Sequence, residues 1–404
     1  MKVLAVADSD SYLKWAACLL DGLPGSTVEL ALLRTPIAPS PAQVEAALTG
    51  TRAAGTPVVP LPARRVRRIA ERFRPDAILL ACTGPVVDVL AADVLDGMRP
   101  RPVLVSGLPG ISVPATERAW IFRSGCDLFV VHSTREVEEF SAIGRRLGGG
   151  GRIGLARLPF LDGPAPDAGP PGNGPRDRVV FATQAKVPRR REERESILIA
   201  LAELAARRPD LDVVVKLRAL GGERQTHNER HPYDRLWASL VERGAVPDGA
   251  VRFAAGSMHE HLSRAAGFVT VSSTAALEAI ARSVPLLVLD DFGVSAEMIN
   301  LVFEGSGCLG GLEELVKGAF RTPDEEWCRA NYFHAPGLAD WTLRLAELVD
   351  LARAGRLRPA ESLLDGPEHA AARRRARLRA EVPPNVLRAG YRAKRRVRRY
   401  VRPR

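Results

Sequence analysis

The sequence predicts an α/β fold built from two doubly wound domains, joined by a linker and followed by a basic helical tail. Short apolar runs rich in β-branched residues alternate with helical patterns along most of the chain. The runs are continuously apolar, which indicates strands covered on both faces, as in a parallel sheet. At 162–177 the chain is rich in proline and glycine, and the alternation then starts again. We therefore expect two parallel sheets that face each other across a cleft.

The expected strands fall into two groups. In the first half they cover 3–7, 28–33, 77–82, 103–106, 128–132 and 153–158. In the second half they cover 179–182, 213–217, 251–254, 268–272 and 285–289. The first crossover helix begins among the capping residues 8–11 and ends at Gly22, and beyond Pro336 the pattern is helical again. We accordingly expect a first domain (1–161), a linker (162–177), a second domain with terminal helices (178–356) and a tail (357–404).

Composition excludes several classes of protein. The chain has 404 residues, of which 46% are apolar and 26% charged, so it has ample core and is not disordered throughout. No apolar stretch approaches the 18 residues of a membrane-spanning helix. The five cysteines lie far apart without a CxxC pair, which suits reduced thiols in a cytoplasm. No HExxH or Cys-His pattern indicates a metal site.

The most informative segment lies at 267–291. A buried strand ends at Ser272, Ser273 and Thr274, and a helix begins there with Glu278 near its start. At such a turn, backbone N–H groups and hydroxyls point into the crevice and the helix dipole adds positive potential, which suits a phosphate or diphosphate. Glu278 would then accept hydrogen bonds from ribose hydroxyls. The alternative is an ordinary helix cap followed by a surface glutamate.

The run that begins at Ser272, S-S-T-x-x-L-E-A-I followed by P-L-L-V-L, resembles the donor-nucleotide segment of GT-B glycosyltransferases, which have two Rossmann-like domains. The resemblance extends to the domain order over residues 1–350. It is strongest with bacterial capsule and surface-polysaccharide transferases and with actinobacterial glycosyltransferases. It implies that the second domain holds the nucleotide sugar, with this segment at the phosphate and ribose and with Thr183 and Gln184 near the donor phosphate.

A second group of polar residues follows the strand expected at 213–217. Lys216 and Arg218 should emerge at the carboxyl edge of the sheet, where they would bind phosphate oxygens. His231 precedes a proline, and this pair is similar to the His-Pro pair of CMP-sialic acid and Kdo transferases, in which the histidine assists the departing phosphate. His227 is an equal candidate for that role. A polar surface loop is the alternative for the whole stretch.

The first domain offers candidates for the acceptor side. Transfer of a sugar to a hydroxyl needs a general base, and inverting relatives commonly take an Asp or Glu from this domain. We expect Asp10 in this role, with Asp8 in reserve, although either residue would also serve as a helix cap. Gly107, Gly110 and His132 follow later strands and would line the same side. Turn geometry alone also explains the two glycines.

The charge of the chain is concentrated at its end. The net charge is +11, but residues 373–404 contain 14 Arg or Lys against one acid, Glu381, so this segment carries +13 and residues 1–372 carry −2. Such a segment would bind an anionic membrane surface as a basic helix. Nucleic acid and a solvated tail without a partner stay open as alternatives, but no nucleic-acid-binding motif accompanies the tail.

These observations predict a cytoplasmic glycosyltransferase, peripheral at the inner face of the membrane. It would move a sugar from a nucleotide-activated donor, CMP- or UDP-linked, to a surface-polysaccharide or lipid-linked acceptor. We expect no cofactor and no compulsory metal, since the helix start after Ser272, with Lys216 and Arg218, would stabilise the leaving group. Two alternatives stay open: a nucleotide-sugar 2-epimerase of the same fold, and a non-catalytic protein that binds membrane or RNA.

Overall fold

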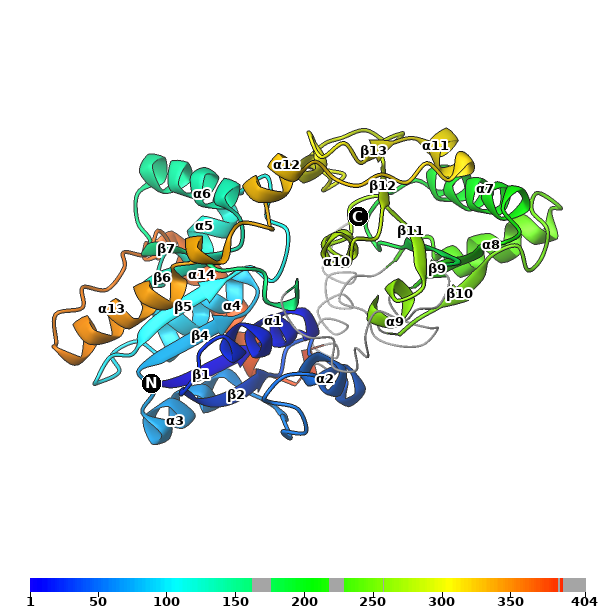
Figure 1. Ribbon diagram of the computed structural model, residues 1–404. Coiled ribbons are helices and arrows are strands. Elements are labelled where there is room, and N and C mark those ends of the chain that lie inside the picture. Colours follow the sequence, from blue (N-terminus) through cyan, green and yellow to red (C-terminus); the bar gives the residue numbers. More distant parts are fainter. Residues whose placement is uncertain (162–175, 218–228, 257, 384–385, 388–404) are drawn as a thin grey trace, which may run out of the picture. The chain divides into compact units, whose positions relative to one another are not determined.

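The computed structural model describes residues 1–161, 176–217, 229–256, 258–383 and 386–387 (Figure 1). The chain divides into two compact units. Unit 1 contains Met1–Pro159 and Ala335–Arg404, and unit 2 contains Phe160–His334. Each unit is built around one parallel β-sheet, as the continuously apolar runs predict.

Unit 1 has a seven-stranded sheet in the order β3-β2-β1-β4-β5-β6-β7, with every pair parallel. Its strands are β1 (Lys2–Ala7), β2 (Thr27–Leu33), β3 (Pro60–Leu61), β4 (Ala77–Ala81), β5 (Val103–Gly107), β6 (Leu128–Val131) and β7 (Arg152–Leu155). The chain order reverses between β1 and β4. At this point the loops after the two strands lead in opposite directions, which opens a crevice at the carboxyl edge of the sheet.

Helices cover both faces of this sheet. One face packs against α1 (Asp10–Asp21), α2 (Pro41–Leu48) and α13 (Trp341–Arg353). The other packs against α3 (Ala63–Phe73), α4 (Gly84–Val89), its π-helical continuation η1 (Leu90–Val94) and α14 (Ala370–Glu381). A smaller cluster joins α5 (Glu117–Arg123) and α6 (Thr134–Leu147) to β6. Strand residues alternate between the two main clusters, because successive side chains point to opposite faces.

Unit 2 has a six-stranded parallel sheet in the order β10-β9-β8-β11-β12-β13. Its strands are β8 (Arg178–Ala182), β9 (Asp212–Lys216), β10 (Arg252–Ala254), β11 (Ala265–Thr270), β12 (Leu286–Leu289) and β13 (Leu309–Gly310). Its helices are α7 (Arg191–Arg207), α8 (Tyr233–Glu242), α9 (Met258–Leu262), α10 (Ala275–Ala281), α11 (Leu312–Lys317) and α12 (Glu325–Ala330). Short 3-10 turns complete the two units: η2 (Pro159–Leu161), η3 (Leu301–Phe303), η4 (Pro336–Leu338) and η5 (Pro367–His369). The chain order reverses between β8 and β11, as it does between β1 and β4.

The helix after Pro336 corrects the predicted domain division. The sequence assigns it to the second domain (178–356), whereas α13 lies on the sheet of unit 1 and buries Trp341, Leu345 and Leu348 in its core. Leucine spacing shows that a helix has an apolar stripe, but it does not show which of two sheets the stripe covers.

Part of the predicted tail is also an integral element of unit 1. Arg373 of α14 forms two hydrogen bonds to the Asp88 carboxylate (2.8 and 2.9 Å), and Ala380 is buried against α3 and α4. In the part of the chain that the structure describes, no helix combines the length and the apolar character needed to cross a membrane.

Candidate functional site

Two side chains join the loops that flank the crevice of unit 2. Gln184 lies two residues after β8, and Ser272 lies two residues after β11. The Gln184 Oε1 atom accepts a hydrogen bond from the Ser272 backbone N–H (2.8 Å), and Gln184 Nε2 lies 2.7 Å from Ser272 Oγ. The structure therefore brings together two residues predicted for the donor phosphate, and they link the strand ends where the chain order reverses.

The start of α10 lies beside this pair. Ser273 Oγ accepts from the backbone N–H of Ala275 (3.2 Å), so this hydroxyl occupies the first N–H of α10. Thr274 precedes α10 and is partly exposed, and no acceptor in the described ranges bonds to its backbone N–H. Glu278 is partly exposed on the same helix, and its carboxylate has no hydrogen-bond partner among those residues. These contacts leave an N–H and a carboxylate available for a ligand.

The next strand adds Thr183 and Lys216. The Thr183 backbone N–H and hydroxyl both donate to the carbonyl oxygen of Lys216 (3.1 Å each), which ties the end of β8 to the end of β9. Lys216 is partly exposed, and its Nζ donates to the carbonyl of Leu217 (3.2 Å). Two predicted residues, Arg218 and His227, lie outside the described residues.

Arg194 of α7 is the central residue of unit 2 that the sequence analysis missed. It is 2% exposed. Its guanidinium donates to the carbonyls of Gln184 and Ala185 (3.0 Å each), of Pro188 (2.8 Å) and of His231 (2.8 Å), and it pairs with the Glu229 carboxylate. Its cation also lies 4.8 Å from the centre of the Tyr233 ring. Arg194 thus fixes both the Gln184 loop and the backbone of His231.

No sequence signal distinguished Arg194. It stands in the charged run R-R-R-E-E-R-E-S, where the pattern does not show which arginine is buried. His231 is held here through its carbonyl group, and its side chain is partly exposed. Its role toward a departing phosphate stays a prediction.

In unit 1, Asp8 joins the loops at the point where the chain order reverses. Its Oδ2 atom accepts hydrogen bonds from the backbone N–H (2.9 Å) and hydroxyl (2.5 Å) of Thr83, which follows β4. Asp8 is completely buried, and its Oδ1 atom has no partner among the described residues. Burial raises the pKa of Asp8 to about 6, although the Thr83 bonds and the positive charge of Arg123 act in the opposite direction.

Arg123 supports the same edge from α5. It is buried, and its guanidinium donates to the Tyr12 hydroxyl (2.7 Å), the Gly107 carbonyl (3.1 Å) and the Cys82 carbonyl (3.2 Å). Gly107 has a packing requirement of its own, because a Cβ atom there would lie 2.5 Å from the Trp15 ring. Gly110 lies in the segment after β5 and is partly exposed.

The structure separates the two aspartates considered for the general base. Ser9 caps α1, since its hydroxyl accepts from the backbone N–H of Tyr12. Asp10 is the first residue of α1 and is partly exposed, whereas Asp8 is enclosed. Asp10 is therefore the aspartate that an acceptor could reach in this conformation.

His132 does not line a surface, which corrects the expectation for the acceptor side. Its ring is completely buried, with Trp15 Nε1 donating to Nε2 (2.8 Å) and the carbonyl of Ala156 lying 3.1 Å from Nδ1. The backbone N–H of His132 donates to Glu136 (2.7 Å). The residue holds α1 and α6 against the sheet.

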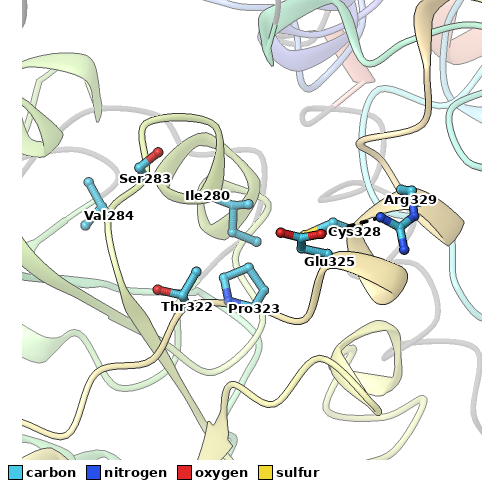
Figure 2. Close-up of a pocket in the computed structure, with 8 residues that line it drawn as sticks. All are labelled: Ile280, Ser283, Val284, Thr322, Pro323, Glu325, Cys328 and Arg329. Carbon is cyan, nitrogen blue, oxygen red and sulfur yellow. Dashed lines mark ion pairs between the residues drawn. The ribbon is translucent and has the colours of Figure 1, made fainter.

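A separate pocket of about 340 Å³ lies in unit 2, and Figure 2 shows the residues that line it. One of them, Ile280, is next to the last residue of α10, at the opposite end from Thr274. Ile280 and Pro323 border it together with Cys328 of α12. Burial raises the pKa of the Cys328 thiol, which keeps it protonated and a poor nucleophile. None of the predicted site residues lines this pocket.

Comparison with solved structures identifies the fold. The chain is similar to a Listeria monocytogenes protein described as a "putative UDP-N-acetylglucosamine 2-epimerase" (12% identity, 88% of this chain and 96% of that one, TM-score 0.56). It is also similar to S. aureus MnaA with UDP (11% identity, 88% of this chain and 96% of that one, TM-score 0.55). A third similar structure is the Neisseria meningitidis UDP-GlcNAc 2-epimerase bound to UDP-GlcNAc (13% identity, 79% of this chain and 90% of that one, TM-score 0.51). At such low identity the likeness concerns the fold, and it confirms two Rossmann-like domains of the GT-B architecture.

Comparison by sequence identifies the family. None of the curated proteins matches the chain. A family model described as "Putative glycosyltransferase (DUF6716)" matches residues 3–348, which is most of the chain. The chain belongs to this glycosyltransferase family, as the segment after Ser272 predicts.

Proposed function

We propose that the protein transfers a sugar from a nucleotide-activated donor to a glycan or lipid-linked acceptor, with the donor in unit 2. One observation carries the donor assignment: Gln184 and Ser272 join the loops of the crevice through neutral groups. Beside them Thr274 presents a backbone N–H for which the described residues offer no acceptor. This neutral pair and the available N–H suit phosphate oxygens, which an acidic side chain in place of Gln184 would repel.

The remaining residues have complementary roles in this proposal. Asp10 takes the proton of the acceptor hydroxyl as its oxygen bonds to the anomeric carbon. The bond from that carbon to the donor phosphate breaks, and the nucleotide leaves with the electron pair. Lys216 stabilises the charge of the leaving phosphate and His231 assists its departure, without a compulsory metal. Glu278 holds the ribose hydroxyls.

A charge substitution at Gln184 tests the donor site. Gln184→Glu keeps the shape of the side chain and an oxygen that accepts from Ser272, so unit 2 should fold normally. Two negative charges about 5 Å apart repel by about 3 kcal/mol at an effective dielectric constant of about 20, so nucleotide binding should weaken on the order of 100-fold. Gln43→Glu, at a partly exposed position of the α2 capping box in unit 1, is the matched control and should bind normally.

Thermal unfolding with CMP, UDP, GDP, dTDP and their sugars supplies the readout. A ligand at about 100 times its Kd adds about 2.7 kcal/mol to the stability of the protein. If no nucleotide raises the unfolding temperature of the natural chain, the donor proposal is refuted. UDP-GlcNAc converted without any acceptor would instead establish the 2-epimerase alternative, and a chelator arm tests whether the transfer needs a metal.

We also propose that the protein works at the cytoplasmic face of a membrane, attached through the basic segment 373–404. The basic residues of this segment support the proposal, since each one near anionic headgroups contributes on the order of 1 kcal/mol. Arg373 and Arg377 do not count toward this sum, because they pair with Asp88 and Asp93 of unit 1. The attachment would bring the enzyme to a lipid-linked acceptor. Binding to anionic vesicles that disappears at high salt is the expected result.

A further inference from the structure

Two basic helices lie together on one face of the sheet of unit 1. The inner side of α14 carries Ala376 and Ala380, which pack in the same cluster as Val66 and Ala70 of α3. Arg64 of α3 also binds the carboxylate of Glu381, through its backbone N–H (2.8 Å) and its guanidinium (3.0 Å). The end of α14 is thus fixed beside α3.

Ion pairs hold α14 from its other side. Arg373 binds Asp88 of α4, and Arg377 binds Asp93 of η1. Residues 373, 376, 377 and 380 have the spacing of one helix face, and this face is directed at unit 1. The opposite face of α14 is consequently directed away from the sheet.

The outward sides of both helices carry unpaired arginines. On α14 they are Arg374, Arg375 and Arg379, and on α3 they are Arg65 and Arg68. All five residues are exposed, and their guanidinium groups have no ion pair or hydrogen bond within the described part of the chain. Leu378, which is 54% exposed, lies among those of α14. We call these six residues the α3/α14 face.

The nearby acids do not cancel this charge. Asp88 and Asp93 are paired with α14, Glu381 is paired with Arg64, and Glu71 is paired with Arg67 (2.8 Å). The carboxylates of these helices are thus matched by other arginines. The five arginines of the α3/α14 face therefore add a net positive charge to a surface held by ordered helices.

We propose that the α3/α14 face binds the anionic headgroups of a lipid bilayer. This inference rests on the proposed membrane attachment and places it on ordered helices of unit 1 as well as on the chain beyond them. Guanidinium groups bind phosphate oxygens in pairs, which suits phospholipid headgroups. Leu378 favours a membrane over nucleic acid, because an apolar side chain among the arginines gains from contact with the acyl boundary.

Full-chain charge variants test the inference. One variant is Arg374→Gln/Arg375→Gln/Arg379→Gln, and a second is Arg65→Gln/Arg68→Gln. Glutamine keeps the helix propensity and removes the charge. The matched control, Arg230→Gln/Arg235→Gln, removes two exposed arginines of unit 2. Unchanged thermal unfolding of each variant establishes that the fold is intact.

Binding is measured by flotation with phosphatidylcholine vesicles that contain phosphatidylglycerol, and with phosphatidylcholine alone. Each arginine near an anionic surface is worth about fivefold in the partition coefficient, so the α14 variant should lose about 100-fold and the α3 variant about 25-fold. The control should stay within about twofold of the natural chain, since its charges lie outside the proposed surface.

The outcomes distinguish a failure of the α3/α14 face from a failure of the proposed membrane attachment. If the natural chain binds the anionic vesicles and both variants bind equally well, the α3/α14 face is refuted while an attachment through later residues stands. If the natural chain itself does not bind, the membrane attachment fails, and the inference with it. If single-stranded RNA displaces the natural chain from the vesicles at the same ionic strength, the lipid proposal is overturned and nucleic acid is the partner of this face.

Discussion

Replacing Arg194 tests how the donor loops of unit 2 are held. Arg194→Met keeps much of the apolar stem of the side chain and removes the guanidinium. Four carbonyl groups lose a donor, and the carboxylate of Glu229 loses its cation. Glu229 is largely buried in this pair, with a side chain 12% exposed, so water replaces the lost contact poorly.

Removal of one partner from a buried ion pair costs about 3–5 kcal/mol, because the other charge stays behind without compensation. Arg194→Met should therefore destabilise unit 2 by about that amount. Arg194→Lys keeps the charge but cannot reach the same oxygens with a planar fork, so its cost should be smaller. Adding Glu229→Gln to Arg194→Met removes the carboxylate charge that Arg194 no longer neutralises and should recover part of the loss.

Urea unfolding followed by tryptophan fluorescence measures these changes, and Trp237 and Trp327 report from unit 2. Arg191→Met on the same helix is the control, because the Arg191 side chain is exposed in its ion pair with Glu195. Its loss should lower the free energy of unfolding by about 1 kcal/mol or less. Nucleotide affinity should fall with Arg194→Met because the Gln184 loop loses its support. Equal stability of the Arg194 and Arg191 variants would show that the buried network does not organise these loops.

Four further substitutions have defined outcomes. Asp10→Asn should preserve donor binding and lower turnover by about 10²–10⁴-fold, and full turnover would move the base elsewhere. Glu278→Ala should weaken nucleotide binding by about 1.5–3 kcal/mol in calorimetry without unfolding the chain. The pKa of Asp8 is raised from 3.8 to about 6 in the folded protein. Its contribution to the free energy of unfolding is therefore fully present below about pH 4 and is lost as the pH rises through about 6. Asp8→Asn should therefore remove about 3 kcal/mol of the fall in unfolding free energy from pH 4 to 7, and an unchanged pH profile would contradict the burial argument. Asp88→Ala leaves Arg373 without its partner and should expose α14 to trypsin at Arg374, whereas unchanged digestion would show that the pair does not hold the helix.

The sequence predicts the sheets better than the surroundings of the sites. The apolar runs locate most strands, because a strand buried on both faces must be apolar throughout. The short edge strands β3 and β13, with two residues each, leave no such run and were not predicted. The packing of α13 on unit 1 was not predicted either, since helical spacing carries no information about which sheet the helix meets.

The site residues divide in the same way. Ser272 and Gln184 follow strands on either side of a reversal in chain order, and topology alone brings such loops together. Arg194 and Arg123 lie on helices, and their contacts depend on tertiary packing that no local pattern records. His132 shows the converse, because a histidine directly after a strand was predicted at the surface and is enclosed by Trp15 and Ala156.

In each unit one side chain joins the two loops where the chain order reverses, and the two joining side chains differ in charge. In unit 1, one oxygen of Asp8 accepts from both the N–H and the hydroxyl of Thr83. In unit 2, the Gln184 side chain bonds to the N–H and the hydroxyl of Ser272. Both pairs join the strand ends where the chain order reverses.

This difference in charge supports the assignment of donor and acceptor independently of the motif after Ser272. A carboxylate at the crevice opposes a phosphate. The positive charge of Arg123 acts against this effect, but its N–H groups donate to neutral oxygens and not to Asp8. The amide of Gln184 has no such effect. The neutral Gln184–Ser272 pair therefore favours our proposal that the donor phosphate binds at the crevice of unit 2 and the acceptor hydroxyl at unit 1.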